Sequence, residues 1–250
     1  MDNFLHVNIM KFEVNDNKTI ITIFERVSEV MDEVRLEYDS DGVRCRALSR
    51  SHVEFVQFDL QSSFFTEYNV DTPDAICVDL SELNKVLKRC KNNDTLSMSV
   101  DEGNLIVTFS GDSTRTFNIR LIDLEYESPN APVLDLPVTL DMDSDVLADM
   151  LDDALLFSES ARFTVDEDYL YCHGEGDFGD TTSKYIHGEQ ITESVASTFN
   201  IPSLKGMLKT KSLAKNCTLR LGENQPLLLT FNVDDGVLEF MIAPRIETDY

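Results

Sequence analysis

No apolar run in this 250-residue chain approaches the roughly 18 residues that a membrane-spanning helix needs. The first residues also lack the basic, apolar and small-residue regions of a secretory signal. These two absences exclude a membrane protein and a secreted protein as working hypotheses. We therefore expect a soluble, intracellular protein that makes no membrane contact.

Cysteine is sparse, odd in number and widely spread: Cys45, Cys77, Cys90, Cys172 and Cys217. No two lie at the close spacing of a zinc site, so we expect buried free thiols in a reducing compartment. His173 and His187 are each followed by glycine and glutamate, but single histidines of this kind are typical of loops and strand edges. We expect no metal site and no cofactor.

Positive charge is scarce, with 21 basic against 46 acidic residues and a net charge of −25. A surface this acidic normally repels the phosphates of nucleic acids. The distribution of the basic residues qualifies that expectation, because many of them fall in four helical segments. These are Lys18, Arg26, Lys85, Lys88, Arg89, Lys91, Lys205, Lys209, Lys211 and Lys215.

Apolar residues at helical spacing predict helices at residues 17–31, 81–92, 144–157 and 203–215, with Ser81 as the N-cap of the second. Most of the remainder predicts short strands separated by turns. This pattern indicates an α+β fold in which each half packs two helices on antiparallel sheet. We expect an N-terminal domain at 10–126 after an extension at 1–9, a proline-containing connector at 127–132 and a C-terminal domain at 133–250.

A lysine-bearing helical segment followed by a strand pattern occurs twice, at residues 81–109 and again at 202–231. Leu83, Leu87 and Lys88 of the first copy correspond to Leu204, Leu208 and Lys209 of the second. The lysines lie opposite the apolar stripes. They indicate either a solvated helix face or a surface for sequence-independent contact with phosphates, because no aromatic residues are interleaved for base recognition.

The segment at 144–157 differs from the other three, since its polar side carries Asp145, Asp149, Asp152 and Asp153 and no basic residue. Such a helix would repel DNA unless it were neutralised. Its carboxylates could instead meet basic residues of a neighbouring subunit and set the register of assembly.

Several stretches, taken in order, resemble a known family. They are residues 47–53 (ALSRSHV), 87–95 (LKRCKNNDT), 101–106 (DEGNLI), 115–117 with 120–123 (RTF and RLID), and the ending at 240–247 (FMIAPRIE). Together they are similar to the archaeal and eukaryotic-type sliding clamps, the proliferating cell nuclear antigen family, from about Met10 onward.

The resemblance implies two similar domains per subunit and a homotrimer closed head-to-tail into a ring around double-stranded DNA. The implied function is that of a DNA polymerase processivity factor, which catalyses nothing and tethers replication and repair enzymes. The implied partners are DNA polymerase, flap endonuclease, DNA ligase and a clamp loader, each docking through a short peptide motif. The implied location is the cytoplasm at the nucleoid, or the nucleus in a eukaryote.

Three sets of residues carry these roles by resemblance. The DNA-facing set is Lys18, Arg26, Lys85, Lys88, Arg89, Lys205, Lys209, Lys211 and Lys215. The partner-peptide groove is Leu48, Ser49, His52, Val53, Phe55, Leu124, Tyr126, Pro129, Ala131, Pro132, Pro226, Met241, Ala243 and Pro244, although plain core packing also explains its apolar members. The subunit interface is Arg89, Lys91, Arg115, Phe117, Ile119, Asp145, Asp149, Phe178 and Tyr185.

Two departures from the family pattern are apparent. The acidic segment at 144–157 adds no positive charge to a DNA-lining surface, and the connector lacks the bulky aliphatic residues of many eukaryotic clamps.

Other classes of protein have less support. The sequence contains no phosphate-binding loop and no nucleophile–base spacing, so no catalytic residues are expected. A metal-dependent nuclease would rest on scattered carboxylates alone. An acidic interaction module, or a mimic of DNA charge that does not encircle DNA, remains the alternative.

Overall fold

The computed structural model describes residues 10–123 and 127–246, which fold into two compact units. Among these residues, the first unit contains 10–47, 57–123, 127–130 and 233–237, and the second contains 48–56, 131–232 and 238–246. Leu124 and Tyr126, predicted to line the groove, lie outside the described residues, as does the extension at 1–9.

The first unit carries a five-stranded antiparallel sheet in the order β5-β1-β7-β8-β9. Its strands are β5 (Glu67–Val70), β1 (Met10–Val14), β7 (Thr95–Asp101), β8 (Asn104–Ser110) and β9 (Thr114–Arg120). A second set of strands pairs in the sheet order β6 (Asp74–Asp79), β2 (Glu33–Tyr38), β3 (Gly42–Leu48) and β4 (Glu54–Gln61). A short 3₁₀ turn, η1 (Ser62–Phe64), follows β4 in the chain.

The second unit repeats this plan with a four-stranded antiparallel sheet in the order β13-β12-β11-β14. Its strands are β13 (Gly179–Ile186), β12 (Tyr169–Gly176), β11 (Ser160–Val165) and β14 (Val195–Asn200). The other strands follow in the order β10 (Val138–Asp143), β15 (Asn216–Leu221), β16 (Leu227–Val233) and β17 (Gly236–Ile242).

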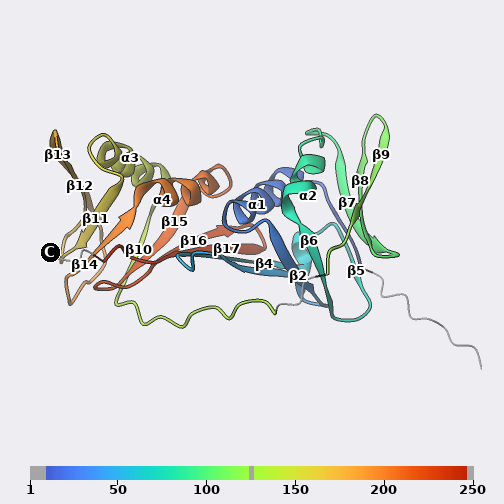
Figure 1. The fold of residues 1–250 in the computed structure, drawn as a ribbon, viewed down its shortest axis with the longest axis horizontal. Coiled ribbons are helices and arrows are strands. Elements are labelled where there is room, and N and C mark those ends of the chain that lie inside the picture. Colours follow the sequence, from blue (N-terminus) through green and yellow to red (C-terminus); the bar gives the residue numbers. More distant parts are fainter. Residues whose placement is uncertain (1–9, 124–126, 247–250) are drawn as a thin grey trace, which may run out of the picture. The chain divides into compact units, whose positions relative to one another are not determined.

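Each unit has two helices that pack against one another (Figure 1). They are α1 (Asn17–Val30) and α2 (Leu80–Leu87) in the first unit, and α3 (Ser144–Leu155) and α4 (Ile201–Leu208) in the second, where a 3₁₀ turn η2 (Lys209–Ser212) continues α4. Their apolar faces are buried, as the helical spacing predicts. The predicted α+β class with antiparallel sheets and two helices per half is therefore confirmed.

Aromatic pairs mark the core of each unit. Phe24 of α1 meets Phe58 edge-to-face at 5.9 Å between ring centroids in the first unit. Phe163 and Phe199 lie 6.1 Å apart in the second. All four rings are almost fully buried, and offset or edge-on pairs of this kind add to the stabilisation from area burial.

Three local expectations were wrong. The second helix ends at Leu87 and not at residue 92, so Cys90 lies beyond it and is partly exposed instead of buried on a helical stripe. The N-cap of this helix is Asp79, not Ser81, and its carboxylate accepts hydrogen bonds from the backbone N–H groups of Ser81 and Glu82. The fourth helix ends at Leu208, where η2 takes over.

Candidate functional site

The duplicated helices α2 and α4 have the same framework. Each is eight residues long, each begins after a side-chain cap, from Asp79 or Asn200, and each ends at a lysine C-cap, Lys88 or Lys209. Their buried positions also correspond: Leu80, Leu83 and Leu87 in α2, and Ile201, Leu204 and Leu208 in α4. The repeat seen in the sequence is therefore a repeat of structure.

Several cations of the α1–α2 pair are already matched with carboxylates. Lys85 donates to Glu82 at 2.6 Å, and this hydrogen bond raises the pKa of Lys85. Arg26 lies between Glu25 and Glu29, at 3.6 and 2.7 Å, and only 11% of its side chain is exposed. These two members of the predicted DNA-facing set therefore contribute little net charge to the surface.

The end of α2 is different, because Lys88, Arg89 and Lys91 are exposed there. Within the described part of the chain, none of these three side chains has a carboxylate within ion-pair distance. Lys88 lines a hollow together with Glu25 and Glu29, which are both engaged by Arg26, and with Asp32. The exposed positive charge of the first helix pair is thus concentrated at the end of α2.

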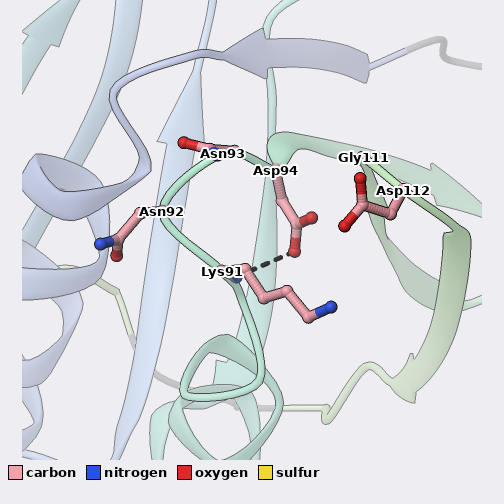
Figure 2. A pocket seen from close by; sticks show the side chains of 6 residues that line it. All are labelled: Lys91, Asn92, Asn93, Asp94, Gly111 and Asp112. Carbon is pink, nitrogen blue, oxygen red and sulfur yellow. Dashed lines mark hydrogen bonds between the residues drawn. The ribbon is translucent and has the colours of Figure 1, made fainter.

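The turn after α2 is held in place by a buried carboxylate. Asp94, whose side chain is 4% exposed, accepts the backbone N–H of Lys91 at 2.8 Å and an ion pair from Arg115. Arg115 also donates to the carbonyl of Arg89 at 2.8 Å. Figure 2 shows the Asp94 carboxylate turned toward the Lys91 backbone, while the Lys91 ammonium group extends away from this turn.

A hollow of about 360 Å³ adjoins the turn and is lined by residues 91–94 with Gly111 and Asp112 (Figure 2). Gly111 approaches Asp94 so closely that a Cβ there would lie 2.3 Å from a carboxylate oxygen. Glycine at this position therefore permits the contact between the β8–β9 turn and the end of α2.

In the α3–α4 pair, the lysines meet the aspartates of the acidic helix. Lys211 donates to Asp145 at 2.6 Å, and Lys215 lies 3.4 Å from Asp143 at the start of α3. Lys205 forms an ion pair with Asp152 in the third turn of α3. Two of the four aspartates of the acidic helix, Asp145 and Asp152, are thus paired with lysines of their own unit.

The pKa values report the same environment. The hydrogen bond that Lys211 donates to Asp145 raises the pKa of Lys211, and the negative charges of Asp145, Asp149 and Asp152 add to the effect. At the helix start, backbone hydrogen bonding and then Lys215 lower the pKa of Asp143. Lys211 therefore lies in a field set by three carboxylates.

Strands β9 and β13 each lie at the edge of a sheet. Each pairs on one side only, β9 with β8 over seven residues and β13 with β12 over eight. Two other edge strands receive hydrogen bonds from nearby backbone: Ile122 donates to Cys77 of β6, and Arg245 donates to Thr198 of β14. Long edge strands are templates for pairing with another chain.

The predicted interface residues lie on or beside these two edges. Phe117 and Ile119 are half-buried on β9, and Tyr185 is half-buried on β13. Phe178, in the turn before β13, is 99% exposed, and Phe157 is partly exposed with its ring against Gly179. Of the charged members, Arg115 and Asp145 already have partners within the chain.

Part of the predicted groove assembles in the second unit as an apolar cluster near the surface. Phe55 and Met241 are buried together, and Leu48 and Ala131 pack against them. The cluster also contains Leu134, Leu136 and Leu228, which sequence reasoning missed. Their alternation with exposed residues, as in Val133–Leu134–Asp135–Leu136, was the available signal.

A tight turn precedes the cluster. Ser49 and Glu54 are joined by two hydrogen bonds, and His52 adopts a positive φ of 59° within that turn. Val53 is 43% exposed, and its carbonyl accepts the backbone N–H of Ala243 at 2.8 Å. Ala243, Pro244 and Pro226 are half-buried and Pro132 is exposed, while Pro129 belongs to the first unit.

Across residues 10–123 and 127–246, no group of three or more histidine, cysteine or acidic side chains is arranged to hold a metal ion. In the same ranges, no helix is long and apolar enough to cross a membrane.

Comparison with known proteins covers nearly the whole chain. Residues 9–130 match the N-terminal domain of proliferating cell nuclear antigen, and residues 130–246 match its C-terminal domain. The DNA polymerase sliding clamp of Methanobrevibacter smithii is 42% identical over 243 residues, covering 96% of this chain and all of the relative. The clamp of Methanothermobacter thermautotrophicus is 40% identical with the same coverage.

The fold has also been observed experimentally. The crystal structure of proliferating cell nuclear antigen from Thermococcus kodakaraensis superposes with a TM-score of 0.88 at 26% identity, covering 94% of this chain and all of that one. Two similar antiparallel units with paired helices, matched in order by both domain families, define a DNA clamp. The chain belongs to the proliferating cell nuclear antigen family, as its sequence predicts, and it is a processivity factor of the sliding-clamp type.

Proposed function

We propose that this chain forms a homotrimeric ring that encircles duplex DNA and tethers replication and repair enzymes to it. The observation that carries the proposal is the match of both clamp domains together with the long edge strands β9 and β13, each of which pairs on one side only. We divide the chain at the connector, residues 127–132, between domains at 10–126 and 133–250. We place the assembly on the genomic DNA of the cell, at the nucleoid.

The ring would close by pairing β9 of one subunit with β13 of the next. The two strands differ in surroundings, so this contact is heterologous, and heterologous contacts form closed rings when the rotation per subunit allows it. Half-buried Phe117 on β9 and exposed Phe178 before β13 supply apolar area for the joint.

Ion pairs would add to the joint. Arg89 and Lys91 are exposed near β9, and Asp149 is exposed on α3, so these charges are available to meet across subunits. Arg115 and Asp145 already form ion pairs within the chain, with Asp94 and Lys211. They would contribute to the subunit joint only if they kept these partners and met a charge of the neighbouring subunit as well. Assembly should then weaken as salt rises, and trimer dissociation that is insensitive to salt would contradict these ion pairs.

Duplex DNA would lie against the helices, which carry many of the basic residues of an otherwise acidic chain. Contacts with phosphates are independent of sequence, which suits a ring that slides. The chain would catalyse no reaction and would act by holding its partners at high effective concentration.

The apolar cluster around Phe55 and Met241 would be the docking groove for partner peptides. Half-buried Leu48, Ala131 and Leu134 line its accessible side, and the extended segments at 127–136 and 241–246 offer backbone hydrogen-bonding groups. DNA polymerase, flap endonuclease, DNA ligase and the clamp loader are the proposed partners.

Two measurements test the proposal. The first is the mass in solution, which should be about three times the 28.3 kDa chain mass. The second is primer extension by a family B polymerase from a related archaeon with the matching clamp loader, where the clamp should lengthen the products. A stable monomer that never lengthens them would overturn the proposal.

The groove has its own test. Ala131→Arg should weaken the binding of a polymerase-derived peptide at least about tenfold, because a charge would enter an apolar contact. Val133→Arg, at a nearby position that is 99% exposed and outside the predicted groove, is the matched control and should change the affinity little. Equal loss in both variants would argue that the groove lies elsewhere.

A further inference from the structure

The connector is tied to the first unit by one hydrogen bond. The Ser128 hydroxyl donates to Oε1 of Glu37 at 2.7 Å, across 91 positions of the sequence. Among the described residues, this is the only hydrogen bond that the segment 127–137 makes. Further along the segment, Ala131 and Leu134 pack against the apolar cluster of the second unit. The polar attachment of this segment therefore depends on a single pair of side chains.

Glu37 is held in place by strand pairing on both sides. Strand β2 lies between β3 and β6, where Glu37 is opposite Arg44 on one side and Ala75 on the other. The residues before and after Glu37 are buried, so its carboxylate lies on the face of the sheet that points away from the core. Arg35, on the same face, lies 3.8 Å from this carboxylate. A carboxylate fixed in this way is a strong acceptor, because a hydrogen bond to an ionised group is stronger than one between neutral groups.

We propose that Ser128 and Glu37 form a latch that positions the connector for peptide docking, and that Ser128 acts through the connector without touching the peptide. This inference rests on the proposed function, since it presumes that partner peptides dock beside the connector. Pro129, the residue after Ser128, is a predicted member of the groove. Its ring fixes its own φ angle, so holding Ser128 also restricts where the following residues of the connector can lie.

The latch would act by ordering the connector before a peptide arrives. A segment that is already ordered loses less conformational freedom on binding, and the affinity is higher by that difference. Without the latch, the peptide itself would have to order the connector. Affinity should then fall although no contact with the peptide has been removed.

Loss of either partner of the latch should weaken peptide binding. Ser128→Ala and Glu37→Ala should each lower the affinity for a polymerase-derived peptide about threefold, the effect expected for one partly exposed hydrogen bond. Isothermal titration calorimetry should show the loss as a less favourable binding entropy. Glu37→Gln keeps an acceptor oxygen and should restore most of the affinity. Ser40→Ala, at an exposed serine of the β2–β3 turn, is the matched control and should bind as the wild type does.

The double variant tests whether the two residues act as one unit. Ser128→Ala combined with Glu37→Ala should weaken binding no more than either change alone, because both remove the same hydrogen bond. NMR relaxation of the Asn130 amide should show more motion in each free variant than in the free wild type. Solution mass and the midpoint of thermal unfolding should be unchanged, since the latch lies outside the core of the unit.

The outcomes separate the latch from the groove. If Ser128→Ala weakened binding and Glu37→Ala did not, the serine would contact the peptide directly, and the latch would be overturned while the groove stood. Wild-type affinity in both variants, or a loss in the double variant equal to the sum of the two, would overturn it in the same way. If the wild-type clamp did not bind the peptide at all, the groove of the proposed function would fail as well.

Discussion

Helices α2 and α4 are copies of one module with different surfaces. Their lengths, caps and buried leucines correspond position by position, yet lysines in and after α4 pair with aspartates of α3, whereas Lys88 at the end of α2 forms no ion pair in the described chain. The packing of a repeated module therefore does not determine its charge. Function has to be read from the pairs that each copy makes with its neighbouring helix.

The largest effects on stability should come from the buried leucines that occupy corresponding positions in α2 and α4. Leu83→Ala and Leu204→Ala each remove a buried side chain, with exposed fractions of 0% and 2%, and should each cost about 2–5 kcal/mol of unfolding free energy. Guanidinium unfolding followed by circular dichroism measures both. A loss confined to one of the two variants would break the structural equivalence of the helices.

The helix caps should give an intermediate effect. Asp79→Ala and Asn200→Ala each leave backbone N–H groups of the first turn without their side-chain acceptor, which costs about 1 kcal/mol. Hydrogen exchange of the α2 and α4 amides reports the loss in each helix separately. Unchanged protection in either variant would show that this cap contributes nothing.

Acid should distinguish the two caps. Hydrogen bonding from Ser81, with the backbone N–H of Glu82, lowers the pKa of Asp79 below its ordinary value of 3.8. A carboxylate with a lowered pKa in the folded state stabilises above its unfolded pKa, and that contribution disappears as pH falls through the folded value. Asn200 does not titrate, so Cα chemical shifts should show α2 fraying in acid before α4.

Asp79→Asn is the control for this acid effect, because asparagine keeps the cap without the titration. In that variant the two helices should respond alike between neutral pH and mild acid. A persisting difference would assign the acid sensitivity of α2 to another group.

The smallest effect on stability should come from the ion pairs that distinguish the two helices. Lys205→Ala removes an exposed partner of Asp152 and should change the unfolding free energy by less than about 1 kcal/mol, with little change at high salt. A larger loss would mean that the α3–α4 pairs hold the unit together. Their role would then be structural as well as electrostatic.

Much of the fold could be predicted from periodicity. The four helical segments, the antiparallel strands and the repeat all follow from apolar spacing and turn residues, which depend on local sequence. Helix ends were less accessible, because Asp79 and Ser81 are both capping residues and only backbone geometry decides between them. Cys90 was misplaced because α2 ends at Leu87, before the predicted end at residue 92.

The pairing of charges could not be read from the sequence. Lys211 and Asp145 are 66 positions apart, and Arg115 and Asp94 are 21 apart, so each pair depends on how the elements pack. The sequence shows that the segment at 144–157 is acidic. Only the structure shows which lysines pair with its aspartates. Leu134 and Leu228 were missed because the apolar cluster brings together separate stretches of the chain, from Leu48 to Met241.

The central claim is that this chain is held on DNA by encircling it. The direct measurement is retention after loading onto a nicked circular plasmid, compared before and after the plasmid is cut to a linear form. A ring held by topology should stay on the circle through gel filtration and leave rapidly once the DNA has free ends. Equal retention on circular and linear DNA, or no retention on either, would contradict the account.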